Sequence, residues 1–341
     1  MLGQDAGPVT EVVDPTGAVA DDALPSLQAA LDPDEANHQL VSRLSLHPDA
    51  SVERIAVVRH KPGRRAIVEY RVCEPEGAGS ETLVMLGKVR VKRYGKSGHR
   101  RLQAFWSAGF EPSADDRISV PEPLGTIPRF RMWLQRKVPG RPASDLLAAD
   151  DGTGVARRAA EVAHKVHASD IATDIIHDLD DELRILHDHL VLVEQWLPDL
   201  TDRTQRLLAA CDRRAAQARP NPPCGVHRDF YGDQILVDGP QCWLLDLDLY
   251  CIGDPALDAG NFLGHITEQS IRDHGSPDAL AAVEAALWEQ FLELEGEIVG
   301  PMVQLYADLT LARHVYLSAV RPERRVHTPA ILRVAEDRFG L

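Results

Sequence analysis

The hydrophobic pattern of this chain changes once along its length, near residue 155. Before that point, short runs of β-branched residues alternate with turn residues, as is typical of an antiparallel sheet. After it, apolar residues recur at the three- and four-residue spacing of amphipathic helices. Strands followed by helices indicate an α+β fold, in which a small β-rich lobe precedes a larger, mostly helical lobe. The helical part has one strand-rich interruption, residues 224–252.

Three segments are predicted from this pattern. They are an acidic N-terminal extension with a helix (1–45), a β-rich lobe (46–137) and a helical lobe (138–341). Residues 1–20 have no helical period, so we expect them to be loosely ordered. The helix of the extension is expected to begin at Asp32 or Asp34, because either side chain is a suitable N-cap.

The β-rich lobe is predicted in more detail from its turn residues. A hairpin is expected around residues 60–65, where Pro62 and Gly63 separate two β-branched runs. A third strand begins at Leu83, a helical stretch follows around 100–108, and another strand runs over 129–138. Together these form a small antiparallel sheet.

The charge of the chain is unevenly distributed. The formal net charge is −15, and residues 1–42 contain eight acidic residues and no Lys or Arg. This excess argues against a nucleic-acid partner, which requires a basic face. The N-terminus has no basic start followed by an apolar stretch, and no window approaches the roughly eighteen apolar residues of a membrane span. We therefore expect a cytoplasmic protein with no membrane partner; the oligomeric state is left open.

The five cysteines carry no recognisable site. They form no CxxC pair and their number is odd, so neither a zinc knuckle nor a disulfide framework is indicated. We expect buried, reduced thiols.

The densest group of chemistry-bearing residues lies between residues 224 and 264. His227 and Asp229 are expected in a turn, Gln234 follows five residues after the aspartate, and an apolar run ends at Asp246 and Asp248. Phosphoryl transfer needs a carboxylate facing the acceptor hydroxyl and oxygen ligands for the magnesium ion that bridges the nucleotide phosphates. This segment offers both.

Other interpretations of the same residues are weaker. A metallohydrolase would need more histidine ligands, and the later candidates His265 and His314 lie in helical patterns typical of core or surface residues. His164 and His167 are expected on a helix face. A nucleophilic mechanism has no G-x-S-x-G motif to support it. The few scattered aromatic residues do not indicate a cage for a quaternary ammonium.

Two motifs in order, HRDFYGDQ (227–234) and LLDLDLYCIGDPALD (244–258), carry a family resemblance. The chain resembles the aminoglycoside phosphotransferase and choline kinase family of kinase-like small-molecule phosphotransferases over roughly residues 50–335. There the first motif usually reads H-G-D with an Asn five residues on, and the second D-x-E/D followed by G-D-P. The resemblance implies a bilobal protein-kinase-like fold, with ATP and Mg²⁺ as cofactors.

The resemblance also implies roles for the residues of the second lobe. Asp229 would be the catalytic carboxylate that orients the acceptor hydroxyl. Asp246 would bind the bridging magnesium, and Asp248 would lie in its outer shell or bind a second ion. Gln234 stands where Asn is usual and would offer its amide oxygen to the metal. The loop-structuring residues would be His227 and Asp254.

In the first lobe, the resemblance points to nucleotide contacts. Lys88 matches the strand lysine that binds the nucleotide phosphates, while the acidic residue that usually pairs with it is replaced by Gln103. Arg64 and Arg65 lie at the hairpin tip, where the family covers the phosphates, and a solvated turn is the competing interpretation. The segment that contacts the adenine is matched by Gln135, Arg136 and Val138, with the Val138 amide bonding the ring.

The function predicted is therefore transfer of the ATP γ-phosphate to a hydroxyl of a small molecule, such as an aminoglycoside, an amino sugar or another sugar-containing metabolite. The alternative is a catalytically weak or inactive kinase-like binding or regulatory protein, which the two glutamines at positions 103 and 234 favour. Acceptor-site candidates come from two helical segments: Asn261, His265, Glu268 and Arg313.

Overall fold

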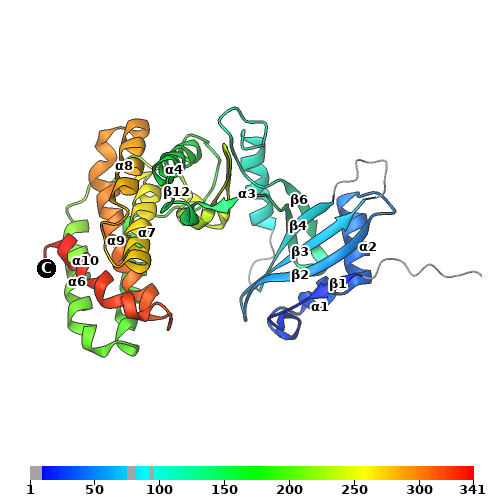
Figure 1. Cartoon of the computed structure of the whole chain (residues 1–341), viewed down its shortest axis with the longest axis horizontal. Helices are drawn as coiled ribbons and strands as arrows, with labels where there is room; N and C mark the ends of the chain where they lie inside the picture. Colours follow the sequence, from blue (N-terminus) through cyan, green and yellow to red (C-terminus); the bar gives the residue numbers. More distant parts are fainter. Residues whose placement is uncertain (1–9, 75–81, 92–95) are drawn as a thin grey trace, which may run out of the picture. The chain divides into compact units, whose positions relative to one another are not determined.

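The computed structural model describes residues 10–74, 82–91 and 96–341, and the chain divides into two compact units, Met1–Pro139 and Gly140–Leu341 (Figure 1). The first unit is rich in strands and the second in helices, which confirms the predicted α+β class.

A sheet with the strand order β1-β2-β3-β4-β7-β6 forms the first unit. Its strands are antiparallel neighbours except for β1, which runs parallel to β2. The strands are β1 (Glu11–Val13), β2 (Ser51–Lys61), β3 (Arg65–Cys73), β4 (Leu83–Arg90), β6 (Pro123–Ile127) and β7 (Met132–Arg136). Alternate residues of β3 and β4 are buried, because a strand presents successive side chains to opposite faces. The predicted hairpin and third strand are confirmed.

The N-terminal segment belongs to the core of this unit. Helices α1 (Ser26–Ala30) and α2 (Pro33–Leu44) bury Leu27 and Leu40 in the same hydrophobic cluster as the strands. The Tyr70 hydroxyl of β3 donates to the Ala30 carbonyl oxygen (2.9 Å). Asp32 is the N-cap of α2 and accepts from the Glu35 amide (2.8 Å), as predicted. The expectation of loose order over residues 1–20 is wrong for the part that is described, since β1 completes the sheet edge.

The remaining elements of the first unit are short. They are η1 (Ala18–Ala20), α3 (Lys96–Ser107), β5 (Ile118–Ser119) and the 3-10 turn η2 (Pro128–Phe130). The strand predicted over 129–138 is therefore shorter, because Pro128 starts a turn that Arg131 ends with a φ of +50°.

Helices pack against one another in the second unit, and Figure 1 shows α7, α8 and α9 side by side. The helices are α4 (Gly152–His167), α5 (Leu179–Leu190), α6 (Thr201–Ala215), α7 (Ala256–His274), α8 (Ala281–Glu295), α9 (Gly300–Ala319) and α10 (Thr328–Phe339). Short 3-10 turns join them: η3 (Ala143–Asp145), η4 (Val191–Gln195), η5 (Pro198–Leu200), η8 (Glu297–Val299) and η9 (Arg325–His327). Gly260 lets α7 approach α9 closely, since a Cβ there would lie 2.4 Å from Tyr306 Cβ. No helix in the described part of the chain is both long and apolar enough to cross a bilayer.

The predicted strand-rich interruption is confirmed between α6 and α7. Strand β9 (Cys224–Val226) pairs with β12 (Cys251–Gly253), and β10 (Ile235–Asp238) forms a hairpin with β11 (Gln241–Leu244). Strand β8 (Arg141–Pro142) pairs with β10. Two 3-10 turns complete the segment, η6 (Gly232–Gln234) and η7 (Leu247–Leu249).

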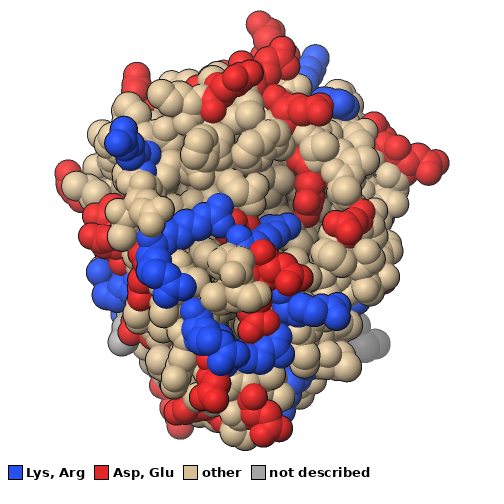
Figure 2. Space-filling view, turned by 90° about the vertical axis from the view of Figure 1, so that its left-hand side faces the viewer, with Lys and Arg blue, Asp and Glu red and all other residues tan. Residues whose placement is uncertain are grey.

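Basic and acidic side chains alternate on the face of the molecule seen in Figure 2, where Lys and Arg form an arc with carboxylates between them. Ion pairs join the helices of the second unit. Arg203 of α6 donates to Glu336 of α10, with Nε 3.0 Å from Oε1. Arg214 of α6 donates to Asp308 of α9 (2.7 Å). These pairs connect three helices by charge as well as by apolar packing.

Candidate functional site

Residues 227–234, which we call the catalytic turn, connect β9 to β10. Their backbone is held by Asp258 of α7, whose side chain is fully buried. Asp258 Oδ2 accepts from the His227 amide (2.8 Å) and Oδ1 from the Arg228 amide (2.7 Å). Hydrogen bonds from backbone amides to a buried carboxylate are strong. Asp258 therefore fixes the entry to the turn.

Asp229 lies between two anchored neighbours. Arg228 precedes it with a φ of +74°. Phe230 follows it with a buried ring, whose centroid lies 5.7 Å from that of His227 and 5.5 Å from that of Phe262. The Asp229 side chain itself is half-buried. The turn thus presents the Asp229 carboxylate from a backbone fixed on both sides.

The catalytic turn is bonded to the end of the β10–β11 hairpin. His227 is fully buried, and its Nε2 donates to the Leu245 carbonyl oxygen (2.8 Å). A carbonyl oxygen can only accept, so Nε2 carries the proton. The Leu245 amide in turn donates to the Gln234 carbonyl oxygen (2.8 Å). The residue after Leu245 is Asp246, so the turn and the strand end meet.

Three residues with oxygen-bearing side chains lie along the chain at the ends of this hairpin. Gln234 is buried and ends η6. Asp246 has a left-handed conformation (φ +51°) and directly precedes η7, which contains the half-buried Asp248. Among the described residues, no three His, Cys, Asp or Glu side chains gather as a metal-binding group. Mg²⁺ is usually held by one or two carboxylates together with substrate phosphates. Two carboxylates and an amide oxygen fit that ion.

Asp254 structures the far end of the second motif. Its Oδ1 accepts from Asn221 Nδ2 (2.9 Å) and from the Ala256 amide (2.9 Å), and Oδ2 accepts from the Asn221 amide (3.0 Å). The same carboxylate therefore ties the loop before β9 to the first residue of α7.

In the first unit, Lys88 lies on β4. Its Nζ atom is 4.9 Å from the centroid of the Trp133 ring, a distance that allows a cation–π contact. Gln103, at the position expected to hold the acidic partner, donates instead to the Ser107 hydroxyl of its own helix (3.5 Å).

The β2–β3 turn lines a basic cavity of about 530 Å³. Its walls are formed by Lys61, Gly63, Arg64, Arg65, Arg90 and Val91. Arg90 was not predicted, although the pairing of Arg65 with Arg90 across β3 and β4 follows from the strand register. Asp21 anchors the tip, because its Oδ2 accepts from the Gly63 amide (2.8 Å) and lies 2.8 Å from His60 Nε2.

The segment after β7 is the one predicted to contact the adenine. Gln135 is buried within the sheet, and the amides of Arg136 and Lys137 donate to the Glu122 and Val84 carbonyl oxygens (2.9 Å each). Among the described residues, no hydrogen bond of the Val138 amide is found. That amide is available to a ligand such as the edge of a purine.

The four acceptor-site candidates lie on α7 and α9. Asn261 and Arg313 take part in a buried polar network described below. Glu268 is buried and already paired, with Oε1 3.1 Å from Arg272 Nε and 3.7 Å from an Arg324 nitrogen. An ammonium group on an acceptor would compete with these two arginines.

His265 contacts the catalytic turn directly. Its ring stacks on Tyr231, two residues beyond Asp229, with centroids 4.4 Å apart, and meets His314 edge-on at the same distance. Burial and the charge of Arg313 lower the pKa of His265 to about 3, so the imidazole is neutral. Burial and the neighbouring His265 also lower the pKa of His314.

Sequence reasoning missed the charged residues behind the turn. His167, expected on a helix face, is buried between Asp258 (3.1 Å from Nε2) and Glu295 (2.8 Å from Nδ1). Glu182 of α5 was not singled out at all, yet it is buried with partners on both oxygens. A histidine or glutamate at a helical spacing gives no signal of this kind, because only the packing shows which face is buried.

Comparisons with known proteins identify a family and a fold. Residues 88–295 match the profile of a family described as the phosphotransferase enzyme family. No curated protein sequence matches the chain.

Several solved structures have a similar fold. A choline/ethanolamine kinase family protein from Mesorhizobium loti is 13% identical over 93% of this chain and 94% of that one, with a TM-score of 0.59. Amicoumacin kinase hAmiN, in complex with AMP-PNP, Ca²⁺ and Ami, is 11% identical over 92% and 96%, with a TM-score of 0.61. A thermostable mutant of aminoglycoside phosphotransferase APH(4)-Ia, bound to AMP-PNP and hygromycin B, is 15% identical over 89% and 97%, with a TM-score of 0.57. The fold is thus that of kinase-like proteins.

Proposed function

Because the chain belongs to the phosphotransferase enzyme family, we propose that it is an ATP- and Mg²⁺-dependent kinase acting on a hydroxyl group of a small molecule. The acceptors we propose are an aminoglycoside, an amino sugar or another sugar-containing metabolite, phosphorylated in the cytoplasm. One observation carries the proposal: the hydrogen bonds of Leu245 to His227 and Gln234 join the turn holding Asp229 to the strand end holding Asp246.

Asp229 is the residue that we assign to the acceptor. The acceptor oxygen forms a bond to the γ-phosphorus while the bond from that phosphorus to the β,γ-bridging oxygen breaks and ADP leaves. The hydroxyl proton passes to the Asp229 carboxylate. Since the transition state is loose, orientation of the hydroxyl is the larger part of this role.

The metal site that we propose consists of Asp246 and Gln234, with Asp248 beside them. These residues would hold Mg²⁺, which would supply positive charge to offset that of the nucleotide phosphates. The protein contributes a fixed backbone at this position, because the Gln234 main-chain carbonyl oxygen accepts from the Leu245 amide. The longer side chain of glutamine keeps the amide oxygen that asparagine would offer.

The nucleotide contacts that we propose lie in the first unit. Lys88 and the guanidinium groups of Arg64 and Arg65 bind phosphate oxygens, for which the bidentate geometry of arginine is well suited. The basic cavity at the β2–β3 turn supports this role. The free Val138 amide donates to the adenine ring, beside Gln135 and Arg136.

A phosphate-transfer assay tests the proposal. A thermal-shift screen with a non-hydrolysable ATP analogue first selects acceptors from amino sugars, aminoglycosides, nucleosides and plain sugars. Transfer of label from γ-labelled ATP is then measured for the wild type and for Asp229→Ala, in which turnover should fall about a hundredfold or more. Asp238→Ala removes an exposed carboxylate from the nearby hairpin and is the matched control. Full activity of Asp229→Ala would remove the basis of the proposal.

A kinase-like binding protein is the second candidate, favoured by the glutamine at position 103. Its side chain bonds within its own helix, where an acidic partner for the nucleotide-binding lysine is usual. Such a protein would bind nucleotide without transferring phosphate. Labelling of any acceptor by the wild type would exclude it.

A further inference from the structure

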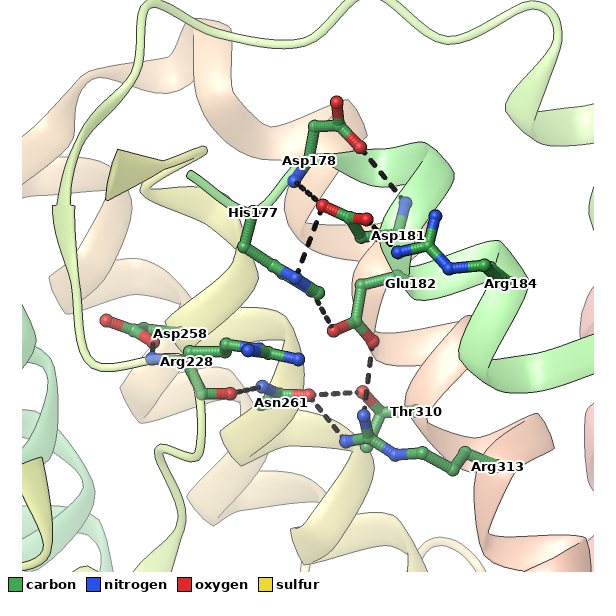
Figure 3. Close-up of polar contacts among 10 residues, drawn as sticks. All are labelled: His177, Asp178, Asp181, Glu182, Arg184, Arg228, Asp258, Asn261, Thr310 and Arg313. Carbon is green, nitrogen blue, oxygen red and sulfur yellow. Dashed lines mark hydrogen bonds and ion pairs between the residues drawn. The ribbon is translucent and has the colours of Figure 1, made fainter. Parts of the chain in front are cut away.

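A chain of hydrogen bonds among side chains of three helices ends at the peptide group that precedes Asp229 (Figure 3). Asn261 of α7 donates from Nδ2 to the Arg228 carbonyl oxygen (2.6 Å). The Arg228 amide is bound by Asp258 of the same helix (2.7 Å). Asp258 and Asn261 are three residues apart and share one face of α7. One helix face therefore holds residue 228 at both of its peptide groups.

The carboxamide of Asn261 is itself held in one orientation. Its Oδ1 accepts from Thr310 Oγ1 (2.6 Å) and from an Arg313 guanidinium nitrogen (3.0 Å), both on α9. Only 1% of Asn261 is exposed. Because Oδ1 has two lone pairs and both are used, the amide nitrogen must face the Arg228 carbonyl oxygen.

Arg313 is oriented in turn by a buried carboxylate of α5. Its other terminal nitrogen lies 3.1 Å from Glu182 Oε2, and Glu182 Oε1 lies 2.6 Å from His177 Nε2. Burial would raise the pKa of Glu182, but Arg313 and His177 outweigh it and hold the pKa below its usual value. Removing one partner of a buried ion pair leaves the other charge uncompensated.

We infer that Arg313 and Glu182 are positioning residues, which orient Asn261 so that its amide fixes the Arg228 carbonyl group and thereby the direction of the Asp229 side chain. The peptide group between residues 228 and 229 is planar and rigid, so holding its oxygen fixes the plane from which Asp229 departs. The inference rests on the proposed function. It gives Asn261 and Arg313 a role behind the turn in place of acceptor binding.

Hydrolysis of Mg·ATP without any added acceptor distinguishes a positioning role of Arg313 from a role in acceptor binding. Water then replaces the organic hydroxyl, so a residue that only contacts the organic acceptor leaves the rate unchanged. Positioning residues act on this reaction too. We expect Arg313→Met to lower the hydrolysis rate about tenfold or more at unchanged KM for Mg·ATP, since misplacing a catalytic group by about 1 Å has effects of this size or larger. A wild-type rate in Arg313→Met would overturn the inference.

Arg203→Met is the matched control. Arg203 also joins two helices through a carboxylate, Glu336, but its hydrogen bonds link α6 to α10 and form no part of the network behind the turn. It should cost thermal stability while leaving the hydrolysis rate unchanged. If Arg313→Met does not fold, Thr310→Val removes one of the two donors to Asn261 Oδ1 with little change of shape, and the same slower hydrolysis is expected.

Amide hydrogen exchange gives a readout that needs no activity. Residues 227–231 should exchange faster in Arg313→Met and Thr310→Val than in the wild type and in Arg203→Met. Unchanged exchange there would overturn the inference even if hydrolysis slowed. If the wild type and Asp229→Ala hydrolyse ATP equally, the proposed function fails, and the exchange result alone decides whether the network holds the turn.

Discussion

His167 Nε2 lies 3.1 Å from the same Asp258 oxygen that accepts the His227 amide. Its other ring nitrogen lies 2.8 Å from Glu295 Oε1. Burial would lower the pKa of His167, but the hydrogen bonds to Asp258 and Glu295 outweigh it and raise the pKa to about 9. A buried imidazolium between two carboxylates therefore supports the backbone of the catalytic turn.

The stability of the protein should fall in alkaline solution because of this group. The pKa of His167 is raised above its unfolded value, so its contribution is fully present below about pH 6.5 and is lost as the pH rises through about 9. A shift of this size corresponds to about 3 kcal/mol of unfolding free energy. Denaturant unfolding between pH 6 and pH 10 measures it. The Cys224 thiol beside these carboxylates stays neutral in this range, since burial raises its pKa to about 12.

A variant without the imidazole separates the contribution of His167 from other losses of unfolding free energy at alkaline pH. His167→Gln should be less stable than the wild type at pH 6, and the difference should shrink towards pH 10. A constant difference across the range would show that His167 does not titrate there.

Gln234 should determine the magnesium requirement. Gln234→Ala removes an oxygen donor, and we expect the Mg²⁺ concentration for half-maximal activity to rise about tenfold or more. Gln234→Asn keeps the donor and should remain active. Gln241→Ala, on the same hairpin, is the control and should match the wild type in a magnesium titration. Equal magnesium curves for Gln234→Ala and Gln241→Ala would remove Gln234 from the metal site.

Gly260 should not tolerate a side chain. A Cβ there would lie 2.4 Å from Tyr306 Cβ and 2.8 Å from the Ala307 backbone nitrogen, so α7 must move away from α9. We expect Gly260→Ala to cost about 1–3 kcal/mol of unfolding free energy. Turnover should fall as well, because Asn261 is the next residue. In Gly300→Ala the new Cβ would meet no atom closer than 3.5 Å. That control should unfold at or above the wild-type temperature.

Asp21 should influence nucleotide binding from the N-terminal segment. Asp21→Asn weakens the acceptor for the Gly63 amide and His60 at the tip that lines the basic cavity. We expect the KM for ATP to rise roughly fivefold, the effect of about one hydrogen bond. Its exposed neighbour provides the control variant Asp22→Asn, which should bind ATP normally. Identical KM values for both variants would contradict the proposed role of the hairpin tip.

The strands of the first unit were predictable from local pattern. Alternate burial along β3 and the Pro-Gly turn before it are encoded within a few residues. The parallel strand β1 was not predictable, because three residues carry no period and their partner β2 lies about forty residues away.

The residues of the candidate site also differ in whether the local sequence pattern points to them. Asp229 and Asp246 were singled out because their spacing along the chain reflects a turn and a hairpin. Glu182 and Arg313 were not linked in advance, since they are 131 residues apart and each occurs at a spacing that suits a solvated helix. Their meeting depends on how α5 and α9 pack, which the helical period alone does not specify.

Arg228 has a φ of +74°, a left-handed backbone conformation that favours glycine. A residue with a Cβ prefers other backbone conformations by roughly 1 kcal/mol or more. The backbone of the turn is therefore strained at Arg228, and the hydrogen bonds to Asp258 and Asn261 of α7 offset this cost. If the hydrogen bond of Asp258 or of Asn261 to Arg228 is lost, we expect the backbone to relax to a more favourable φ and the Asp229 side chain to change direction. A substitution in the buried polar network of the helical unit would then alter the site through the orientation of one carboxylate.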